Sequence, residues 1–427
     1  MERYGIGSSR RKAIIGINGA LCFFVVISLC SICSISFAGT AEVLPKGVWN
    51  VRVDYRHSFN VDERYDPDGD TEDVATDYNT SLNSNIFPAL GLVEDFFGMP
   101  PGSGTVGDSE VSFEYQFDIA ETYISYGLTD KLSVGLYIPY WWIENSVDRR
   151  LNTTNATIGK NVALNTLTPF AVPGTVPLTT QDVLDLLEKG LDINGDGTVE
   201  VPGYGYTRFE TFDDHGLGDM ELGLRYQYLK TGKWRLAFTG GVRLPTGEID
   251  DPDMLQDYAV GSGVYALLFR LNNDYTGIKN LVLNATFQYD WVIPDKQKLR
   301  IPLDVDRPIT RDKETVDRDL GDIFRLEGSA LYTFAKGFSA CLTYWYEFKL
   351  KDDIDGDRGF NYKSLEDETD QKEHIIIARL SYSTLPLYLE KKFPVPLDAS
   401  IFYRDRFAGD NNLLKSQYIG FGLGVYF

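Results

Sequence analysis

The chain has 427 residues and carries 62 acidic against 41 basic side chains, a formal net charge of −21 at pH 7. Nucleic-acid-binding surfaces need clustered basic residues to neutralise phosphates, so this charge balance argues against that class of function. Only four cysteines are present, and three of them (Cys22, Cys30 and Cys33) fall within the first 38 residues. The rest of the chain, with Cys341 alone, can form no internal disulfide.

The N-terminus has the organisation of an export signal. Arg10, Arg11 and Lys12 precede an uncharged stretch over residues 13–37, and Ser36-Phe37-Ala38 supplies the small residues that signal peptidase requires. We therefore predict a signal peptide over residues 1–38, with cleavage before Gly39. A retained membrane anchor is the alternative, because the uncharged stretch is longer than usual. Beyond it, no uncharged apolar run approaches the ~18–20 residues of a membrane-spanning helix, which excludes a helical membrane protein.

From residue 46 onward, apolar and polar side chains alternate as they do in β-strands. In the first such segment, Val51 and Val53 share one face while Arg52 and Asp54 share the other. The same period recurs along the chain, so twelve strands are predicted. They span residues 47–59, 110–128, 131–142, 219–229, 234–244, 260–271, 281–292, 323–334, 338–350, 374–383, 398–407 and 418–427.

The connections between these strands alternate in length. Those after the even-numbered strands are short, whereas the others are mostly long and polar, covering residues 60–109, 148–216, 246–258, 294–320, 351–372 and 408–416. Short periplasmic turns, long extracellular loops and an even strand number are typical of outer-membrane barrels. We therefore predict an all-β protein: one transmembrane antiparallel up-and-down β-barrel of about 12 strands over residues 39–427, in the outer membrane of a Gram-negative bacterium.

The polar faces of the strands are too highly charged to pack a dry core, but they suit a solvated, ion-paired lumen surrounded by a lipid-facing apolar surface. We predict that these side chains line the lumen and determine its selectivity: Arg52, Asp54, Arg56, Glu221, Arg225, Arg235, Arg243, Arg379 and Arg404.

The last ten residues form a strand that ends on an aromatic residue. This pattern resembles the C-terminal signal by which the barrel-assembly machinery recognises outer-membrane proteins. The residues that would carry the signal are Tyr418, Phe421, Leu423, Val425 and Phe427. Outer-membrane lipid and lipopolysaccharide are the further partners that such a location implies.

Two segments resemble a known family. GLGDMELGLRYQY from Gly216, followed by WRLAFTGGVRLPTGE up to Glu248, is similar to the signature hairpin of the outer-membrane transporters named for the MetA pathway of phenol degradation. ETYISYGLTDKLSVGLYIPY, residues 121–140, is similar to the hairpin that precedes it in that family. The resemblance covers about 110–250. It implies an outer-membrane channel for passive uptake or efflux of a small solute, aromatic or otherwise hydrophobic.

LDINGDGTVE, residues 191–200, resembles the first half of an EF-hand calcium loop. Asp192, Asn194 and Asp196 occupy positions 1, 3 and 5, Thr198 offers a carbonyl, and Glu200 stands at position 9. The bidentate glutamate expected at position 12 is replaced by a glycine. The segment therefore predicts either a Ca²⁺ site, in which case a calcium-stabilised structural or adhesive barrel without transport is the alternative function, or a solvated turn. No other cofactor is expected.

The run NIFPALGLVEDFFGMPPG, residues 85–102, is unusually apolar for an exposed loop. We predict that it folds into the barrel mouth as a plug or a hydrophobic entry site, through Ile86, Phe87, Leu90, Phe96 and Phe97. The alternative is a small loop domain packed against a capped helix near residues 180–190.

Enzymatic function is not expected. Barrel lipases need a nucleophile and a base placed together. The only histidines are His57, His215 and His374, and no serine motif accompanies His57 or His374, which we place near the outer rim.

Overall fold

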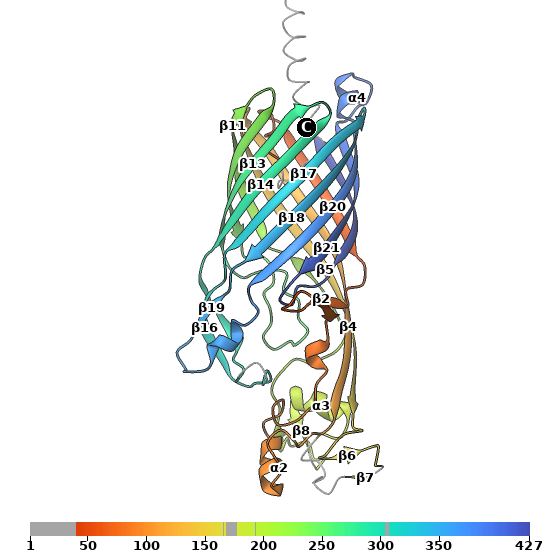
Figure 1. The fold of residues 1–427 in the computed structure, drawn as a ribbon, viewed down its shortest axis with the longest axis vertical. Helices are drawn as coiled ribbons and strands as arrows, with labels where there is room; N and C mark the ends of the chain where they lie inside the picture. The colour runs from red at the N-terminus through yellow and green to blue at the C-terminus, as the bar shows by residue number, and fades with distance from the viewer. Residues whose placement is uncertain (1–39, 165, 168–176, 193, 304–306) are drawn as a thin grey trace, which may run out of the picture.

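The computed structural model describes residues 40–427 except 165, 168–176, 193 and 304–306. Twelve antiparallel strands form a closed barrel in which each strand pairs with its neighbours in sequence (Figure 1), as predicted. Its strands are β1 (Trp49–Ser58), β4 (Asp108–Thr129), β5 (Leu132–Asn152), β11 (Met220–Lys230), β12 (Trp234–Leu244), β13 (Ala266–Ile278), β14 (Leu281–Val292), β17 (Ile323–Ala335), β18 (Phe338–Lys349), β20 (Gln371–Ser383), β21 (Leu397–Gly409) and β22 (Gln417–Tyr426). No helix among the described residues is both long and apolar enough to cross a membrane.

The barrel closes between its first and last strands. β1 pairs with β22 from Asn50 opposite Tyr426 to Ser58 opposite Tyr418. At the end of the seam, the amide of Trp49 donates to the carbonyl of Phe427 at 2.7 Å, and the Phe427 amide donates back at 3.1 Å. Because β1 also pairs with β4, the cylinder has no free edge. In hydrocarbon this closure satisfies the backbone amides that an open sheet would leave unpaired.

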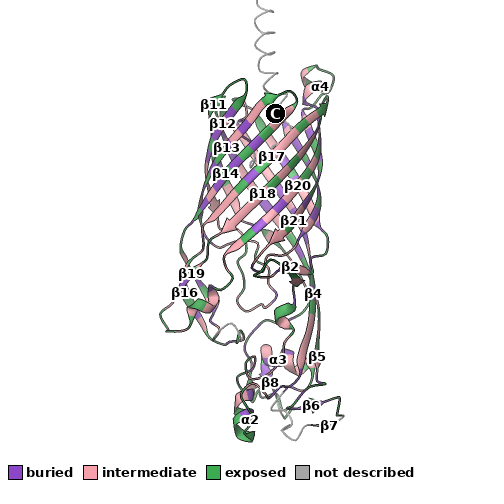
Figure 2. Cartoon of the chain, in the orientation of Figure 1, coloured by how far each residue is buried: buried purple, intermediate pink, exposed green. Residues whose placement is uncertain are grey.

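Burial alternates along the strands in the sense opposite to that of a soluble protein (Figure 2). Asn272, Asp274 and Asp290 point inward and are completely buried, whereas Phe421 and Leu423 point outward with more than half of their surface exposed. Exposed tryptophans stand near strand ends, at Trp49, Trp234 and Trp291, as in the interfacial belts of membrane proteins.

Strands β4 and β5 extend well beyond the rest of the barrel as a two-stranded ribbon (Figure 1). Their pairing continues to Asp108 opposite Asn152, so β5 runs ten residues past the predicted end at Trp142. The short strand β10 (Phe212–Leu217) pairs with residues 140–145 of β5, and β11 pairs with the preceding residues of β5. Along the extension the alternation has the opposite sense, with Phe113 and Tyr115 buried and Glu114 exposed, because it lies outside the membrane-spanning barrel.

The long loops contain the remaining elements except α4 (Leu385–Leu389), which lies between β20 and β21 at the opposite end, where the other turns are short (Figure 1). A small subdomain at the tip of the β4–β5 ribbon holds α2 and α3; a three-stranded sheet, β15-β16-β19, forms from two other loops. The bounds are β2 (Glu63–Tyr65), β3 (Thr71–Asp73), η1 (Thr76–Tyr78), α2 (Leu90–Phe97), β6 (Lys160–Asn161), β7 (Thr166–Leu167), α3 (Thr180–Leu187), β8 (Gly190–Leu191), β9 (Val201–Pro202), β15 (Asp295–Arg300), β16 (Lys313–Asp319), β19 (Asp353–Asp355), η2 (Tyr362–Leu365) and α4 (Leu385–Leu389).

Glycine is required at one lumen-facing position of the seam. A Cβ added to Gly420 would stand 2.6 Å from the backbone oxygen of Tyr55 and 2.4 Å from the ring of Phe402. We therefore expect Gly420→Ala to lower the free energy of unfolding by about 1–3 kcal/mol through overpacking, measured by urea titration in lipid vesicles. Gly328→Ala is the matched control, because a Cβ there meets nothing within 4 Å. Equal stability of the two variants would contradict the packing argument.

Candidate functional site

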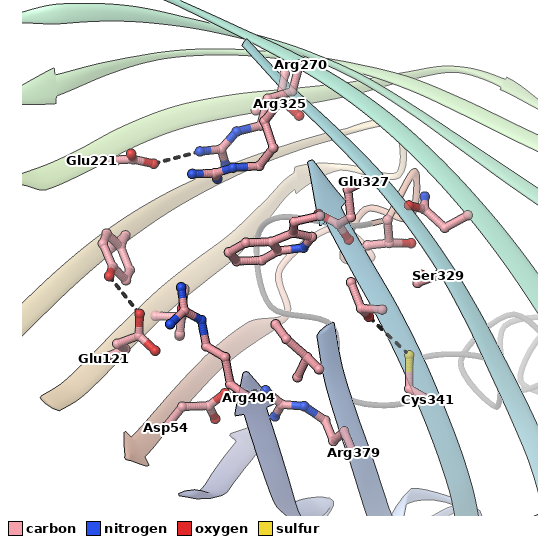
Figure 3. A pocket seen from close by; sticks show the side chains of 18 of the residues that line it. Asp54, Glu121, Glu221, Arg270, Arg325, Glu327, Ser329, Cys341, Arg379 and Arg404 are labelled. Carbon is pink, nitrogen blue, oxygen red and sulfur yellow. Dashed lines mark hydrogen bonds and ion pairs between the residues drawn. The ribbon is translucent and has the colours of Figure 1, made fainter. Parts of the chain in front are cut away.

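The barrel encloses a cavity of about 370 Å³. Strands from all sides of the cylinder contribute to its walls, and the polar side chains point toward one another across it (Figure 3). Six arginines and six acidic residues line the cavity: Arg56, Arg243, Arg270, Arg325, Arg379, Arg404, Asp54, Glu121, Glu221, Asp274, Glu327 and Glu373. The charges therefore balance, and the space is far narrower than the lumen of the ~16–18-stranded porins.

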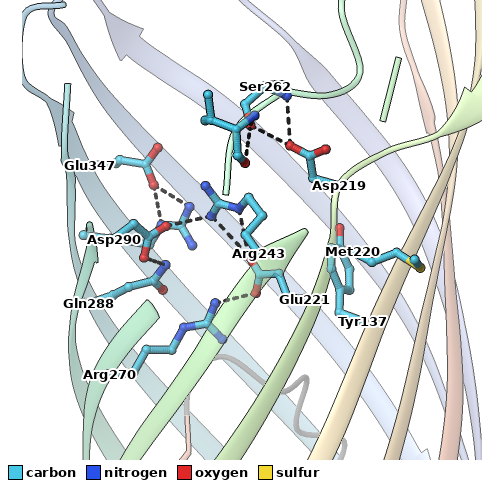
Figure 4. Close-up of polar contacts among 12 residues, drawn as sticks. Tyr137, Asp219, Met220, Glu221, Arg243, Ser262, Arg270, Gln288, Asp290 and Glu347 are labelled. Carbon is cyan, nitrogen blue, oxygen red and sulfur yellow. Dashed lines mark hydrogen bonds and ion pairs between the residues drawn. The ribbon is translucent and has the colours of Figure 1, made fainter. Parts of the chain in front are cut away.

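One wall carries a continuous ion-pair network (Figure 4). Arg243 bridges Glu221 at 3.1 Å and Asp290 at 2.7 Å, and Arg270 binds the second oxygen of Glu221 at 2.8 Å. Arg325 pairs with Glu347 in the same layer. Removing one partner from such a network leaves an uncompensated charge, which is strongly unfavourable. The network therefore fixes these side chains against the wall.

A second network joins side chains of β1 to those of β4 and β20 inside the lumen. Asp54 forms ion pairs with Arg52 at 2.6 Å and with Arg379 at 3.0 Å. Arg56 pairs with Glu121 at 3.2 Å. Arg404 also points into the cavity from β21 (Figure 3), but the structure gives it no ion-pair partner among the described residues.

The residues that narrow the short-turn end of the lumen were not predicted from the sequence. Thr40 and Ala41 are buried inside the barrel, where the hydroxyl of Thr40 and the amide of Ala41 donate to Asp274 at 3.0 and 3.2 Å. Glu42 pairs with Arg235 at 2.6 Å. Residues 40–42 show no alternation of polar and apolar side chains that would predict their position. Only the closed barrel brings them to Asp274, more than 230 residues away in sequence.

At the long-loop end, an apolar collar covers the charged lumen. Phe117, Ile119 and Ile143 of the barrel strands pack there with loop residues, among them Val61 and Val74. The remaining members are Ala75, Phe113, Tyr115, Leu184, Phe209 and Tyr418, with Tyr78, Val111, Trp141, Val147, Leu255, Tyr258, Val260 and Leu414 against them. The loops over residues 61–78 and 255–260 therefore occupy the mouth.

The predicted plug does not lie in that mouth, so this prediction is wrong. α2 is at the far tip of the loop subdomain (Figure 1), where Phe87 and Leu90 are buried together with Leu186 of α3. Ile86 packs against the same cluster, while Phe96 is 81% exposed and Phe97 38%. The alternative of a small loop domain on the capped helix is what the structure shows: Thr179 caps α3 by accepting from the amide of Asp182. The long β4–β5 ribbon, which the sequence did not predict, carries this segment away from the barrel.

All nine predicted selectivity residues lie on lumen-facing strand positions, and six of them line the cavity. Arg52, Arg225 and Arg235 are buried in the lumen wall outside that lining set. In the closing strand, Phe421, Leu423 and Phe427 are exposed on the outer surface and Val425 is partly buried. Tyr418 lies instead on the inner side, with only 5% of its surface exposed.

The acidic loop of the predicted calcium site has the compactness that a cation requires. One carboxylate oxygen from each of Asp192, Asp196 and Glu200 lies within 4.8 Å of the others. Asn194 donates to Glu200 at 2.9 Å. Hydrogen bonds from the side chain and the amide of Thr198 lower the pKa of the Asp196 carboxyl, so that side chain is anionic at neutral pH.

The histidines lie where rim residues are expected. His57 contacts Asp118 through Nδ1 at 2.8 Å, and His374 contacts the hydroxyl of Tyr344 at 2.7 Å. His215 lies near the ring of Tyr140, 6.2 Å between centroids. The contacts found for these three side chains include no serine hydroxyl.

The sequence matches the family described as the MetA-pathway of phenol degradation over residues 100–383, and the chain belongs to that family. The fold is similar to that of an outer-membrane channel from Pseudomonas putida F1, with a TM-score of 0.51 and 12% identity over 92% of this chain and all of the other. A mutant of TodX, a monoaromatic hydrocarbon channel, aligns with a TM-score of 0.37 and 12% identity over 90% of this chain and 91% of the other. No curated protein matches. The protein is thus an outer-membrane β-barrel of bacteria.

The buried N-terminal segment gives a direct test of how the lumen is narrowed. A variant that lacks residues 40–43 should show a larger single-channel conductance in planar bilayers, because Thr40 and Glu42 no longer occupy the lumen. Asp274→Asn, which weakens the anchor of this segment without removing it, should raise the conductance less. Identical conductance in all three proteins would show that the segment does not limit passage.

Proposed function

We propose that the protein is a channel for the passive passage of a small solute, either uptake or efflux, with a preference for amphipathic aromatic compounds. The observation that supports it most directly is a closed cylinder whose interior is charged, partly open and lined from every side, while its exterior is apolar. A protein that only anchored surface loops would have no need to keep a cavity of about 370 Å³ between buried charges.

The order of surfaces along the lumen supports a preference for amphipathic solutes. A solute that enters from the long-loop end meets the apolar collar first, where aromatic rings such as Phe117 and Tyr258 pack 4.8 Å apart between centroids. It then reaches the zone of paired charges. An aromatic body favours the first environment, because burial of apolar surface is favourable, and a polar substituent favours the second. A channel that only selected hydrophilic solutes by size would need neither the apolar collar nor the zone of paired charges.

Solute flux into liposomes tests this proposal. We expect vesicles containing the protein to swell in isotonic solutions of small aromatic alcohols and acids faster than in sugars of larger cross-section, because the cavity is narrow. Protein-free vesicles supply the background for each solute. Swelling equal to that background for every solute would reject channel function.

A second candidate role, calcium binding by the loop subdomain, is favoured by the clustered carboxylates of Asp192, Asp196 and Glu200. Three carboxylates with an amide and a carbonyl form the oxygen-rich set that Ca²⁺ prefers. We propose that the ion would rigidify the turn between β8 and β9, so this role concerns the loop subdomain and is compatible with transport.

Calorimetric titration of the chelator-treated protein with CaCl₂ tests this role. Asp192→Asn and Asp196→Asn should each weaken binding at least ~10-fold, because each removes an anionic ligand. Asp185→Asn is the control, since Asp185 in α3 already pairs with Lys189 at 3.4 Å. Absence of heat with the unmodified protein, or equal affinity in all variants, would contradict calcium binding.

A further inference from the structure

Arg404 differs from the other arginines of the cavity. Its side chain extends from β21 into the cavity (Figure 3), only 9% of its surface is exposed, and no carboxylate of the described chain lies within ion-pair distance. Its Nε is buried without a hydrogen-bond acceptor, as are those of Arg56 and Arg270, but those two arginines have carboxylate partners. By contrast, Arg243 and Arg379 each bind aspartate at 3.0 Å or less. Arg404 is therefore a buried cation directed at open space.

The charges around Arg404 do not neutralise it. Arg56 and Arg406 are among its charged neighbours and repel it, and Glu373 attracts it. Glu373, however, already pairs with Arg406 at 2.6 Å, and Arg56 pairs with Glu121 at 3.2 Å. Three cations thus share two anions in this part of the lumen. A buried charge without a partner is unfavourable, so an anionic group at this position would be stabilised.

Aromatic rings stand beside the same guanidinium. Its Cζ is 6.0 Å from the centre of the Trp345 ring and 5.5 Å from that of Tyr418. These distances are at the outer limit of cation–π attraction, whereas Arg300 lies 3.7 Å from the ring of Tyr206 in the loops. The rings therefore do not replace a counter-ion.

We propose that Arg404 and Trp345 form a binding site for a small aromatic carboxylate inside the lumen. This inference rests on the proposed channel function and specifies the solute. The planar guanidinium matches a carboxylate through two parallel hydrogen bonds. The ring of the solute then lies against Trp345 and Phe402, both of which line the cavity. The cavity has a volume at the lower end of the usual range for ligand pockets, ~300–1,000 Å³, which suits a single-ring compound.

Benzoate is the probe that tests the site, with acetate and benzyl alcohol as partial analogues. We expect benzoate to reduce the single-channel current of the unmodified protein at concentrations at least ~10-fold lower than acetate, which lacks the ring. Benzyl alcohol, which lacks the charge, should block as weakly as acetate. Arg404→Gln should weaken block by benzoate at least ~10-fold, Arg404→Lys less, and Trp345→Leu about 5-fold.

Arg150→Gln is the matched control, because Arg150 is an exposed arginine that pairs with Glu110 on the ribbon outside the barrel; its block by benzoate should equal that of the unmodified protein. Folding of each variant is checked by the mobility shift of the barrel on heating before electrophoresis. Equal block in Arg404→Gln and the unmodified protein overturns the proposal.

Calorimetric binding of benzoate to the detergent-solubilised protein separates this proposal from channel function. Binding that requires Arg404 without any measurable current supports the site and rejects transport. Current without binding, or binding that is unchanged in Arg404→Gln, rejects the site and leaves channel function standing. Should Arg404→Gln fail to fold, the affinity of Arg404→Lys, expected to be reduced at least ~3-fold, decides the matter.

Discussion

The pairing between β1 and β22 is the constraint on which the rest of the structure depends. A sheet in hydrocarbon cannot leave an edge, because no water is present to satisfy the amides and carbonyls that an edge exposes. The reciprocal hydrogen bonds between Trp49 and Phe427 join the first strand to the last residue of the chain. Once the cylinder is closed, one face of every membrane-spanning strand contacts lipid and the other faces the lumen. Apolar side chains therefore point outward and polar side chains point inward, the reverse of a soluble protein.

The many ion pairs in the lumen follow from the free energy that is needed to bury charged side chains. Twelve strands make a narrow cylinder, and the inward positions carry many arginines and carboxylates that are withdrawn from bulk water. Most of them are neutralised by one another, as in the bridge formed by Arg243 between Glu221 and Asp290. The N-terminal segment adds to this packing through Glu42 and Arg235. Paired groups form the wall, whereas Arg404 has no carboxylate within ion-pair distance in the described part of the chain, which is why we propose it as a solute-binding group.

The two ends of the lumen differ in chemistry, which gives a physical basis for discrimination between solutes. The long-loop end is covered by an apolar collar whose members come from the barrel strands and from four separate loop regions. The short-turn end is narrowed by polar backbone and side chains held on Asp274. If the protein acts as the channel that we propose, a solute would lose water at the collar and regain polar contacts in the charged zone. The acidic loop over residues 191–200 lies at neither end of the lumen, since it belongs to the subdomain at the tip of the β4–β5 ribbon.

The sequence by itself determined the barrel: the strand period, the even strand number, the short and long connections and the charged inner face all follow from local patterns, because lipid enforces alternation at every membrane-spanning position. The tertiary structure decided what local patterns do not contain. The length of the β4–β5 ribbon moved the apolar segment around α2 away from the mouth, and loops at 61–78 and 255–260 took that place. Two features depend on distances across the cylinder: the entry of Thr40 into the lumen and the presence or absence of an ion-pair partner for each arginine. These distances are set only when the barrel closes and strands that are remote in sequence face one another.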